Sequence, residues 1–129
     1  MAKLKRVLHV DDEEDIRTIA QMAMEVVGDL EVLQCSNGTQ AIEVSREFSP
    51  DLILLDHMMP GMDGEATFRG LQQIPGLETV PVIFMTARVE AELSQTLIDL
   101  GALDVFLKPF DPMLLCAQLH EAWHKHFGE

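Results

Sequence analysis

The four residues 52–55 constrain the fold of this chain more than any other feature. They form an unbroken apolar run, Leu-Ile-Leu-Leu, which ends at Asp56 and is followed by the turn-forming sequence Met-Met-Pro-Gly. A run of this length, closed by Pro and Gly, is typical of a strand buried on both faces of a parallel sheet. In open α/β sheets, reactive groups gather at the carboxyl ends of the strands. Asp56 therefore occupies a position suited to chemistry, although one aspartate alone is more often a capping or turn residue.

Short apolar runs of this kind alternate with helical patterns along the chain. Strands are predicted at residues 7–10, 30–35, 52–55, 81–86 and 104–107. Helices are predicted at residues 16–27, 37–49, 64–73, 89–100 and 111–127, with Asn37 as a cap and Val89 in the apolar face of the fourth. This alternation at βαβ spacing predicts one doubly wound, five-stranded parallel α/β domain over residues 1–129.

Two of these helices are predicted from specific local signals. Asp111 and Pro112 open the last helix, because Pro is favoured in the first turn. Gly28 ends the first helix, which carries apolar residues at helical spacing on one expected face. Those residues are Ile16, Ile19, Ala20, Ala23 and Val27.

The charge of the chain excludes two classes of ligand. Twenty-two acidic residues against nine Lys plus Arg give a formal net charge of −13. Nucleic acid and anionic membranes bind through clustered cations, so neither is expected as a direct partner. Cys35 and Cys116 lie far apart without metal-type spacing and are expected to be reduced core thiols. With no signal peptide or transmembrane segment visible, we expect a cytoplasmic protein.

Four predicted strands end in residues that could form one site. The ends carry Asp11-Asp12, Asp56, Thr86 and Lys108, respectively. If the first and third strands are neighbours, three carboxylates meet, and each pair repels by roughly 1–4 kcal/mol. Such a cluster requires a cation or a raised pKa, and Mg²⁺, with Mn²⁺ as a substitute, is the natural guest. A lysine and a hydroxyl opposite could hold phosphoryl oxygens, which makes Asp56 the expected oxygen nucleophile for phosphoryl transfer.

The motifs around these residues match a known family in order. They are Val10-Asp11-Asp12-Glu13, Leu55-Asp56, Met59-Pro60-Gly61-Met62-Asp63-Gly64, Thr86-Ala87 and Lys108-Pro109-Phe110. Over essentially its whole length the chain resembles the receiver domain of bacterial two-component response regulators. The resemblance implies a flavodoxin-like receiver fold with strand order 2-1-3-4-5.

The resemblance also implies a role for each site residue. Asp56 would accept a phosphoryl group from the histidine of a sensor kinase or phosphotransfer protein. Asp12 and Asp56 would bind Mg²⁺ directly, Asp11 would help through water, and the backbone carbonyl of Met58 would complete the protein ligands. Lys108 would pair with Asp56 and later with phosphate, and Thr86 would move toward the phosphoryl oxygens. The Lys108-Pro109 bond would be cis.

The chain departs from the family pattern at the switch position. The family usually carries Tyr or Phe three residues before the lysine, where this chain has Val105. Phe106 follows and, by strand alternation, belongs to the opposite face. A rotating aromatic switch is therefore not expected, and output should depend more on the helix at 89–100 and its flanking loops. In the family, the positions of Met58 and Arg88 influence how long the phosphoryl group stays on the acceptor aspartate. An altered lifetime of the phosphorylated Asp56 is therefore expected.

Three histidine features are given no chemistry. His120-Glu121-Ala122-Trp123-His124 matches the zinc-protease pattern HExxH, but with His120 at the edge of the apolar stripe and His124 facing solvent, a surface helix is favoured. His9 is expected to be a packed core histidine, and His57 to point away from the site.

These observations favour a phosphoacceptor switch without an attached output domain, which catalyses only its own phosphorylation and dephosphorylation. It would signal by binding an effector protein through residues 88–129. One alternative is a Mg²⁺-dependent phosphohydrolase with a phosphoaspartate intermediate, but Met58 stands where dehalogenase-type enzymes need a second Asp. Another alternative is a phosphorylation-independent adaptor, which the intact set of site residues disfavours.

Overall fold

The fold is an open parallel sheet with helices on both faces, as the sequence predicts. The computed structural model describes residues 3–88 and 90–128. The sheet has five strands in the order β2-β1-β3-β4-β5, which are β1 Arg6–Val10, β2 Glu31–Cys35, β3 Leu52–Asp56, β4 Val82–Thr86 and β5 Asp104–Leu107. The helices are α1 Glu14–Met22, the π-helix η1 Ala23–Val27, α2 Gly38–Phe48, α3 Gly64–Gln72, α4 Ala91–Leu100 and α5 Leu115–His126.

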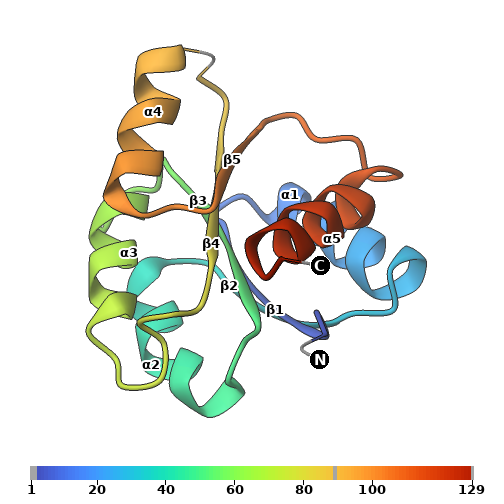
Figure 1. Ribbon diagram of the computed structural model, residues 1–129, viewed down its shortest axis with the longest axis horizontal. Helices are drawn as coiled ribbons and strands as arrows, with labels where there is room; N and C mark the ends of the chain where they lie inside the picture. Colours follow the sequence, from blue (N-terminus) through green and yellow to red (C-terminus); the bar gives the residue numbers. More distant parts are fainter. Residues whose placement is uncertain (1–2, 89, 129) are drawn as a thin grey trace.

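Helices cover both faces of the sheet (Figure 1), and a hydrophobic core lies on each face. Helices α2, α3 and α4 cover one face, where Phe68, Leu71 and Leu97 pack against Ile53 and Phe84. Helices α1 and α5, together with η1, cover the other face, and there the buried residues include Met24, Leu119 and Trp123. Since the strands alternate their side chains between these faces, the central strands are buried on both sides.

Strand β3 is central to the sheet and fully buried. All five of its residues are buried, and it pairs in parallel with β1 on one side and β4 on the other. Val10 of β1 lies opposite Leu55, and Met85 of β4 lies opposite Asp56. The carboxyl ends of these three strands therefore lie side by side, which is the neighbour relation that the expected site requires.

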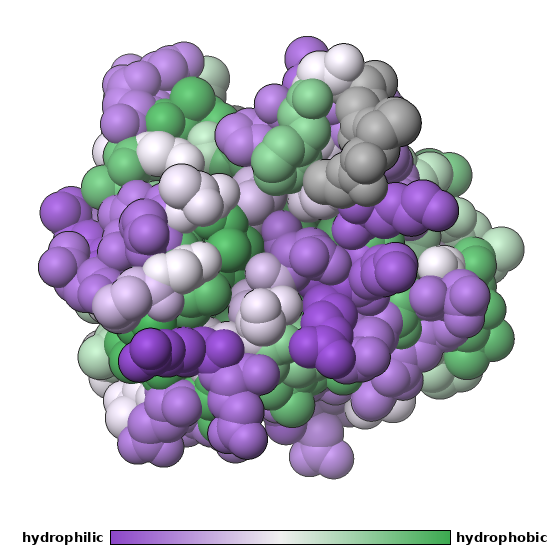
Figure 2. All heavy atoms as spheres, turned by 60° about the horizontal axis from the view of Figure 1, so that its bottom comes forward, coloured by the Kyte–Doolittle hydropathy of each residue, from purple (hydrophilic) through white to green (hydrophobic). Residues whose placement is uncertain are grey.

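The first helix differs from the predicted pattern. The chain changes from α to π geometry at Ala23, and Gly28 ends the helical segment. Ala20, Ala23 and Met24 are buried, whereas Val27 is 55% exposed and Ile19 43% exposed, so the predicted apolar face is wrong at these two positions. The wider π turn changes the side that the residues after Met22 face, which accounts for Val27 and not for Ile19, since Ile19 lies earlier, in α1. Exposed hydrophobic side chains are visible at the right edge of Figure 2, the side on which η1 lies in Figure 1.

The boundaries of the other helices agree with the sequence signals except for the last. The side chain of Asn37 accepts a hydrogen bond from the Gln40 N–H and caps α2, as predicted. Helix α5 begins at Leu115 instead of Asp111. The Asp111 carbonyl accepts the N–H groups of both Leu114 and Leu115, and residues 112–114 form a turn before the helix. Val89 and Glu129, which the predictions included, lie outside the described residues.

The two cysteines agree with expectation. Cys35 and Cys116 are buried free thiols, and the Cys116 Sγ donates to the carbonyl of Ala23, which joins α5 to η1. In the part of the chain that the structure describes, no helix is long and apolar enough to cross a membrane.

Gly64 allows α3 to start directly against the end of β3. A Cβ on Gly64 would lie 2.5 Å from the Asp56 carbonyl oxygen and 2.8 Å from the His57 Cα. The Gly64 N–H also donates to the His57 carbonyl at 2.9 Å. Both neighbours are backbone atoms, so neither can move without displacing the strand end.

We expect Gly64→Ala to lower the free energy of unfolding by about 1–3 kcal/mol, because overpacking against backbone cannot relax. Gly70→Ala on the same helix is the matched control, since its Cβ would meet only the flexible end of Ile42, at 2.6 Å. Urea denaturation followed by circular dichroism measures both variants. An equal effect of the two substitutions would contradict this account of Gly64.

Candidate functional site

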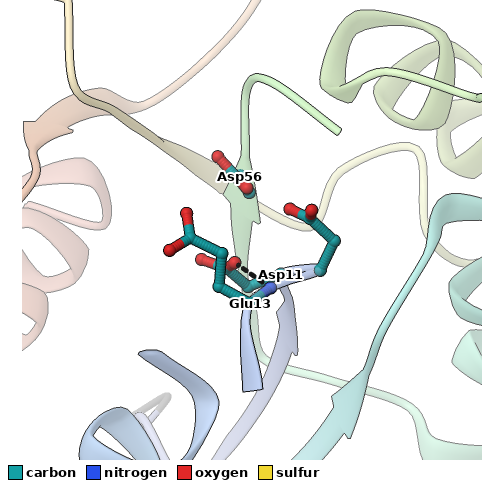
Figure 3. Close-up of side chains that lie close together, drawn as sticks. Asp11, Glu13 and Asp56 are labelled. Carbon is teal, nitrogen blue, oxygen red and sulfur yellow. Dashed lines mark hydrogen bonds between the residues drawn. The ribbon is translucent and has the colours of Figure 1, made fainter. Parts of the chain in front are cut away.

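The site lies where β1 and β3 end beside each other. Asp56 is the last residue of β3, and Asp11 follows the last residue of β1. Both carboxylates are almost completely buried. Figure 3 shows Asp11, Glu13 and Asp56 with their carboxylates gathered at this edge of the sheet, and the Glu13 N–H donates to the Asp11 Oδ1 at 2.9 Å. The sheet topology therefore brings together acids that are more than forty residues apart in the sequence.

Lys108 supplies the positive charge of this cluster. Its Nζ lies 2.9 Å from the Asp11 Oδ2, 3.2 Å from the Asp56 Oδ1 and 3.6 Å from the Glu13 Oε1. Lys108 thus pairs with Asp56, as the resemblance implied, but its shortest contact is with Asp11. The Lys108–Pro109 peptide bond is cis, which is the isomer that the resemblance implied.

Burial and mutual repulsion govern the ionisation of the site. Burial, together with the neighbouring charge of Asp11, raises the pKa of Asp56 to about 7, although Lys108 acts in the opposite direction. Burial acts to lower the pKa of Lys108, but its contacts with Asp11 and Asp56 outweigh burial and raise that pKa overall. One lysine therefore does not balance the carboxylates around it.

The residues fit a hard divalent cation. Asp11, Asp12, Glu13 and Asp56 each offer a carboxylate oxygen, and these oxygens lie within 4.8 Å of one another. The Asp56 Oδ2 is buried and accepts no hydrogen bond from the described residues. Mg²⁺ is bound in proteins through a few carboxylates and completes its shell with water and phosphate oxygens. The donor set and the unpartnered oxygen both match that preference.

Thr86 and Met58 lie on the chain segments that border this cluster. Thr86 ends β4 and is buried, and its Oγ1 accepts the Arg88 N–H at 3.1 Å. The Thr86 carbonyl accepts the Lys108 N–H at 2.8 Å, so the ends of β4 and β5 are joined. The Met58 N–H donates to the Asp56 Oδ1 at 3.3 Å, while the Met58 side chain is exposed. The roles of Thr86 and of the Met58 carbonyl stay predictions.

The side chains of β5 alternate as the sequence predicted. Val105 packs against the core under α2, α3 and α4, and Phe106 packs against the opposite core. No ring therefore occupies the Val105 position on the face that carries α4. Phe106 cannot substitute for it, because the sheet separates the two cores.

The sequence did not assign Glu13 to the site, although its carboxylate belongs to the cluster. Its place directly after Asp11-Asp12 was the only available signal. His9 is a buried core histidine, as expected, and burial lowers its pKa to about 4. His57 belongs to the opposite side of β3 from Asp56, with its Nε2 at 3.6 Å from the Glu65 Oε1 and its ring edge-on to Phe84.

The HExxH segment lies on α5, outside this cluster. His120 and His124 are both half-buried, so the expectation that His124 faces solvent is wrong. The reason is that the His124 ring packs against Trp123, with centroids 5.3 Å apart. Glu121 instead lines a groove with Asp104 and Lys125.

Curated relatives are similar to this chain in sequence. The chain is 39% identical over 115 residues to the phosphate regulon transcriptional regulatory protein PhoB of Pseudomonas aeruginosa. The matched region covers 89% of this chain and 50% of PhoB. The chain is also 38% identical over 107 residues to the sporulation initiation phosphotransferase F of Bacillus subtilis. That matched region covers 83% of this chain and 84% of the relative. The chain therefore spans about half the length of PhoB and most of the second relative.

Solved structures share the fold, and a family model matches most of the chain. The chemotaxis protein CheY4 of Vibrio cholerae superposes with a TM-score of 0.85 at 26% identity, covering 93% of this chain and 99% of CheY4. The family model described as the response regulator receiver domain matches residues 7–120. This chain therefore belongs to the response regulator receiver domain family.

Proposed function

We propose that this chain is a phosphorylation-dependent switch in which Asp56 accepts a phosphoryl group from the histidine of a sensor kinase or phosphotransfer protein. The observation that carries the proposal is the arrangement around Asp56. Its carboxylate lies at the rim of the sheet, 3.2 Å from the Lys108 ammonium and inside a cluster of four acids. Family membership supports a role in two-component signalling, and the specific donor and effector belong to the proposal.

The side chains would act in a single displacement. A carboxylate oxygen of Asp56 forms a bond to phosphorus while the bond from phosphorus to the imidazole nitrogen of the donor breaks. Lys108, which contacts Asp56 before transfer, then balances the negative charge of the phosphoryl oxygens. Asp12 and Asp56, with Asp11 and the Met58 carbonyl, would hold Mg²⁺, which when bound supplies charge neutralisation and orientation of the phosphoryl group.

The phosphoryl group adds about −1.5 to −2 charge at one buried point. Thr86 carries a hydroxyl at the end of the neighbouring strand β4, and its motion toward the phosphoryl oxygens would alter the β4 and β5 ends that its carbonyl joins. The readout surface that we propose consists of α4, β5 and α5, and its partner is an effector protein in the cytoplasm rather than nucleic acid or membrane. The formal charge of −13 supports the last point.

The chain would catalyse only its own phosphorylation and dephosphorylation. A Mg²⁺-dependent phosphohydrolase is the alternative with the same intermediate, but the residue two positions after Asp56 is Met58, which offers no carboxylate as a general acid. A phosphorylation-independent adaptor would have no use for the buried pairing of Lys108 with Asp11 and Asp56.

Incubation with acetyl phosphate and Mg²⁺ should attach one phosphoryl group per chain, and Asp56→Asn should abolish the attachment because the nucleophile is lost. Intact-protein mass spectrometry measures the gain, and hydroxylamine should remove it if the bond is an acyl phosphate. Asp15→Asn makes the same charge change at an exposed position outside the cluster and should leave the gain intact.

The same experiment separates the alternatives. Many phosphates released per chain, with little retained, would indicate the phosphohydrolase. No incorporation into the folded wild-type protein would indicate the adaptor and contradict the proposal.

Mg²⁺ affinity should fall by roughly tenfold between pH 8 and pH 6. With its pKa raised to about 7, Asp56 changes from mostly ionised to mostly protonated over this interval, and a proton competes with the cation for the carboxylate. Titration calorimetry at the two pH values measures the change. An affinity that stays constant would show that Asp56 is ionised throughout or does not bind the ion.

Asp56→Asn should stabilise the fold at pH 8 more than at pH 5, by about 1–3 kcal/mol in the free energy of unfolding. The folded state holds the Asp56 proton more tightly than the unfolded chain, because the folded pKa of about 7 exceeds the ordinary value of 3.8. The cost of the buried charge is therefore absent at low pH, grows above the ordinary pKa and is complete above about pH 7. Urea denaturation without Mg²⁺ at both pH values measures this difference in the free energy of unfolding. A larger stabilisation at pH 5 than at pH 8 would contradict a raised pKa of Asp56 in the folded protein.

A further inference from the structure

Helix α5 carries two histidines that the phosphoacceptor site does not use. His120 and His124 are one helical turn apart, so both side chains lie on the same side of the helix. Their rings are stacked, with centroids 5.8 Å apart and an angle of 17° between the ring planes. Two imidazoles at this spacing are the donor pair that helical zinc sites use.

The contacts around the pair restrict its motion. The His124 ring lies edge-on to the indole of Trp123, at 89° between planes. Trp123 is itself buried, and its Nε1 donates to the Asp51 carbonyl at 3.3 Å. Because Trp123 is fixed to the start of β3, it supports the His124 ring in place. Part of the entropy cost of ordering a ligand side chain is therefore already met in the folded protein.

The ring spacing is close to what a tetrahedral ion requires. A Zn–N bond is about 2.0–2.1 Å long, and a ring nitrogen lies about 1.1 Å from the centroid of its imidazole, so the ion lies about 3.2 Å from each centroid. At a tetrahedral angle the two centroids are then about 5.2 Å apart. The observed distance of 5.8 Å differs from this by about 0.6 Å. The two ring planes are 17° from parallel, so the rings must also turn about their side-chain torsions before a nitrogen of each faces one ion.

The protonation state also suits metal binding. Burial lowers the pKa of His120, and the neighbouring His124 lowers it further, since two adjacent imidazolium ions repel. His120 is therefore neutral at neutral pH, which is the form that binds metals.

We propose that His120 and His124 form a two-histidine site for a borderline divalent transition cation such as Zn²⁺, with water in the remaining coordination positions. Imidazole nitrogen prefers this class of ion over Mg²⁺. Among the described residues, the cluster at the strand ends is the only group of three or more acidic, histidine or cysteine ligands. The α5 site therefore has two protein ligands, and Glu121, on the groove beside β5, does not complete a peptidase centre.

A bound ion would join two successive turns of α5 and reduce the local negative charge. The site does not involve Asp56, so its existence is independent of the phosphoacceptor function. Failure of either proposal leaves the other standing.

Calorimetric titration of the full chain with Zn²⁺ tests the site, in excess Mg²⁺ so that the acidic cluster is occupied. We expect one Zn²⁺ per chain at the pair, with affinity at least about tenfold weaker in His120→Ala and in His124→Ala, which corresponds to 1.4 kcal/mol or more. His126→Ala is the matched control, because this histidine is exposed and two residues further along the same helix, and it should retain the wild-type affinity.

Nitrogen-15 NMR of the wild-type imidazoles provides a second measurement that needs no folded variant. The ring signals of His120 and His124 should shift together on Zn²⁺ addition, and those of His126 should not. Unchanged affinity in either alanine variant, equal loss in His126→Ala, or unmoved His120 and His124 signals would each overturn the proposal.

Discussion

The repulsion among carboxylates at the ends of β1 and β3 is the constraint on which the site depends. Asp11 and Asp56 are buried side by side, and burying like charges together is costly without a counter-charge. Lys108 supplies that charge. It directly follows β5, which lies at the edge of the sheet and is separated from β3 by β4. The three strands can bring these groups together only because β1 lies next to β3 and all strands run in parallel.

This incomplete balance of charge supports the chemistry that we propose for the pocket. A carboxylate whose pKa is raised to about 7 is held in an unfavourable state when ionised, and a cation or a covalent bond to phosphorus relieves it. The cost of ionising the buried Asp56 carboxylate lowers the stability of the folded protein. The same cost suits the carboxylate to the proposed reaction. In the proposed function, stability and reactivity therefore oppose each other at the Asp56 side chain.

The sequence predicted the sheet and most of the site because its signals were local and strong. Apolar runs fix each strand, and the first polar residue after a run marks the strand end, as at Asp56 and Thr86. Family resemblance added the strand order, which periodicity alone does not determine. Glu13 was missed because five consecutive acids, residues 11–15, follow β1 and give no local indication of which of them turn toward the lysine. The π turn at η1 and the delayed start of α5 were missed because both depend on backbone hydrogen bonds that have no distinct sequence pattern.

The valine at position 105 changes how a signal could leave the pocket. A ring can store a signal as one of two rotamers, whereas Val105 is stiff about its single side-chain torsion and offers no comparable pair of positions. In the proposed function, a displacement of Thr86 would therefore pass through the main chain, where the Lys108 amide donates a hydrogen bond to the Thr86 carbonyl. In this proposal, a displacement carried by that hydrogen bond would move the ends of β4 and β5 together.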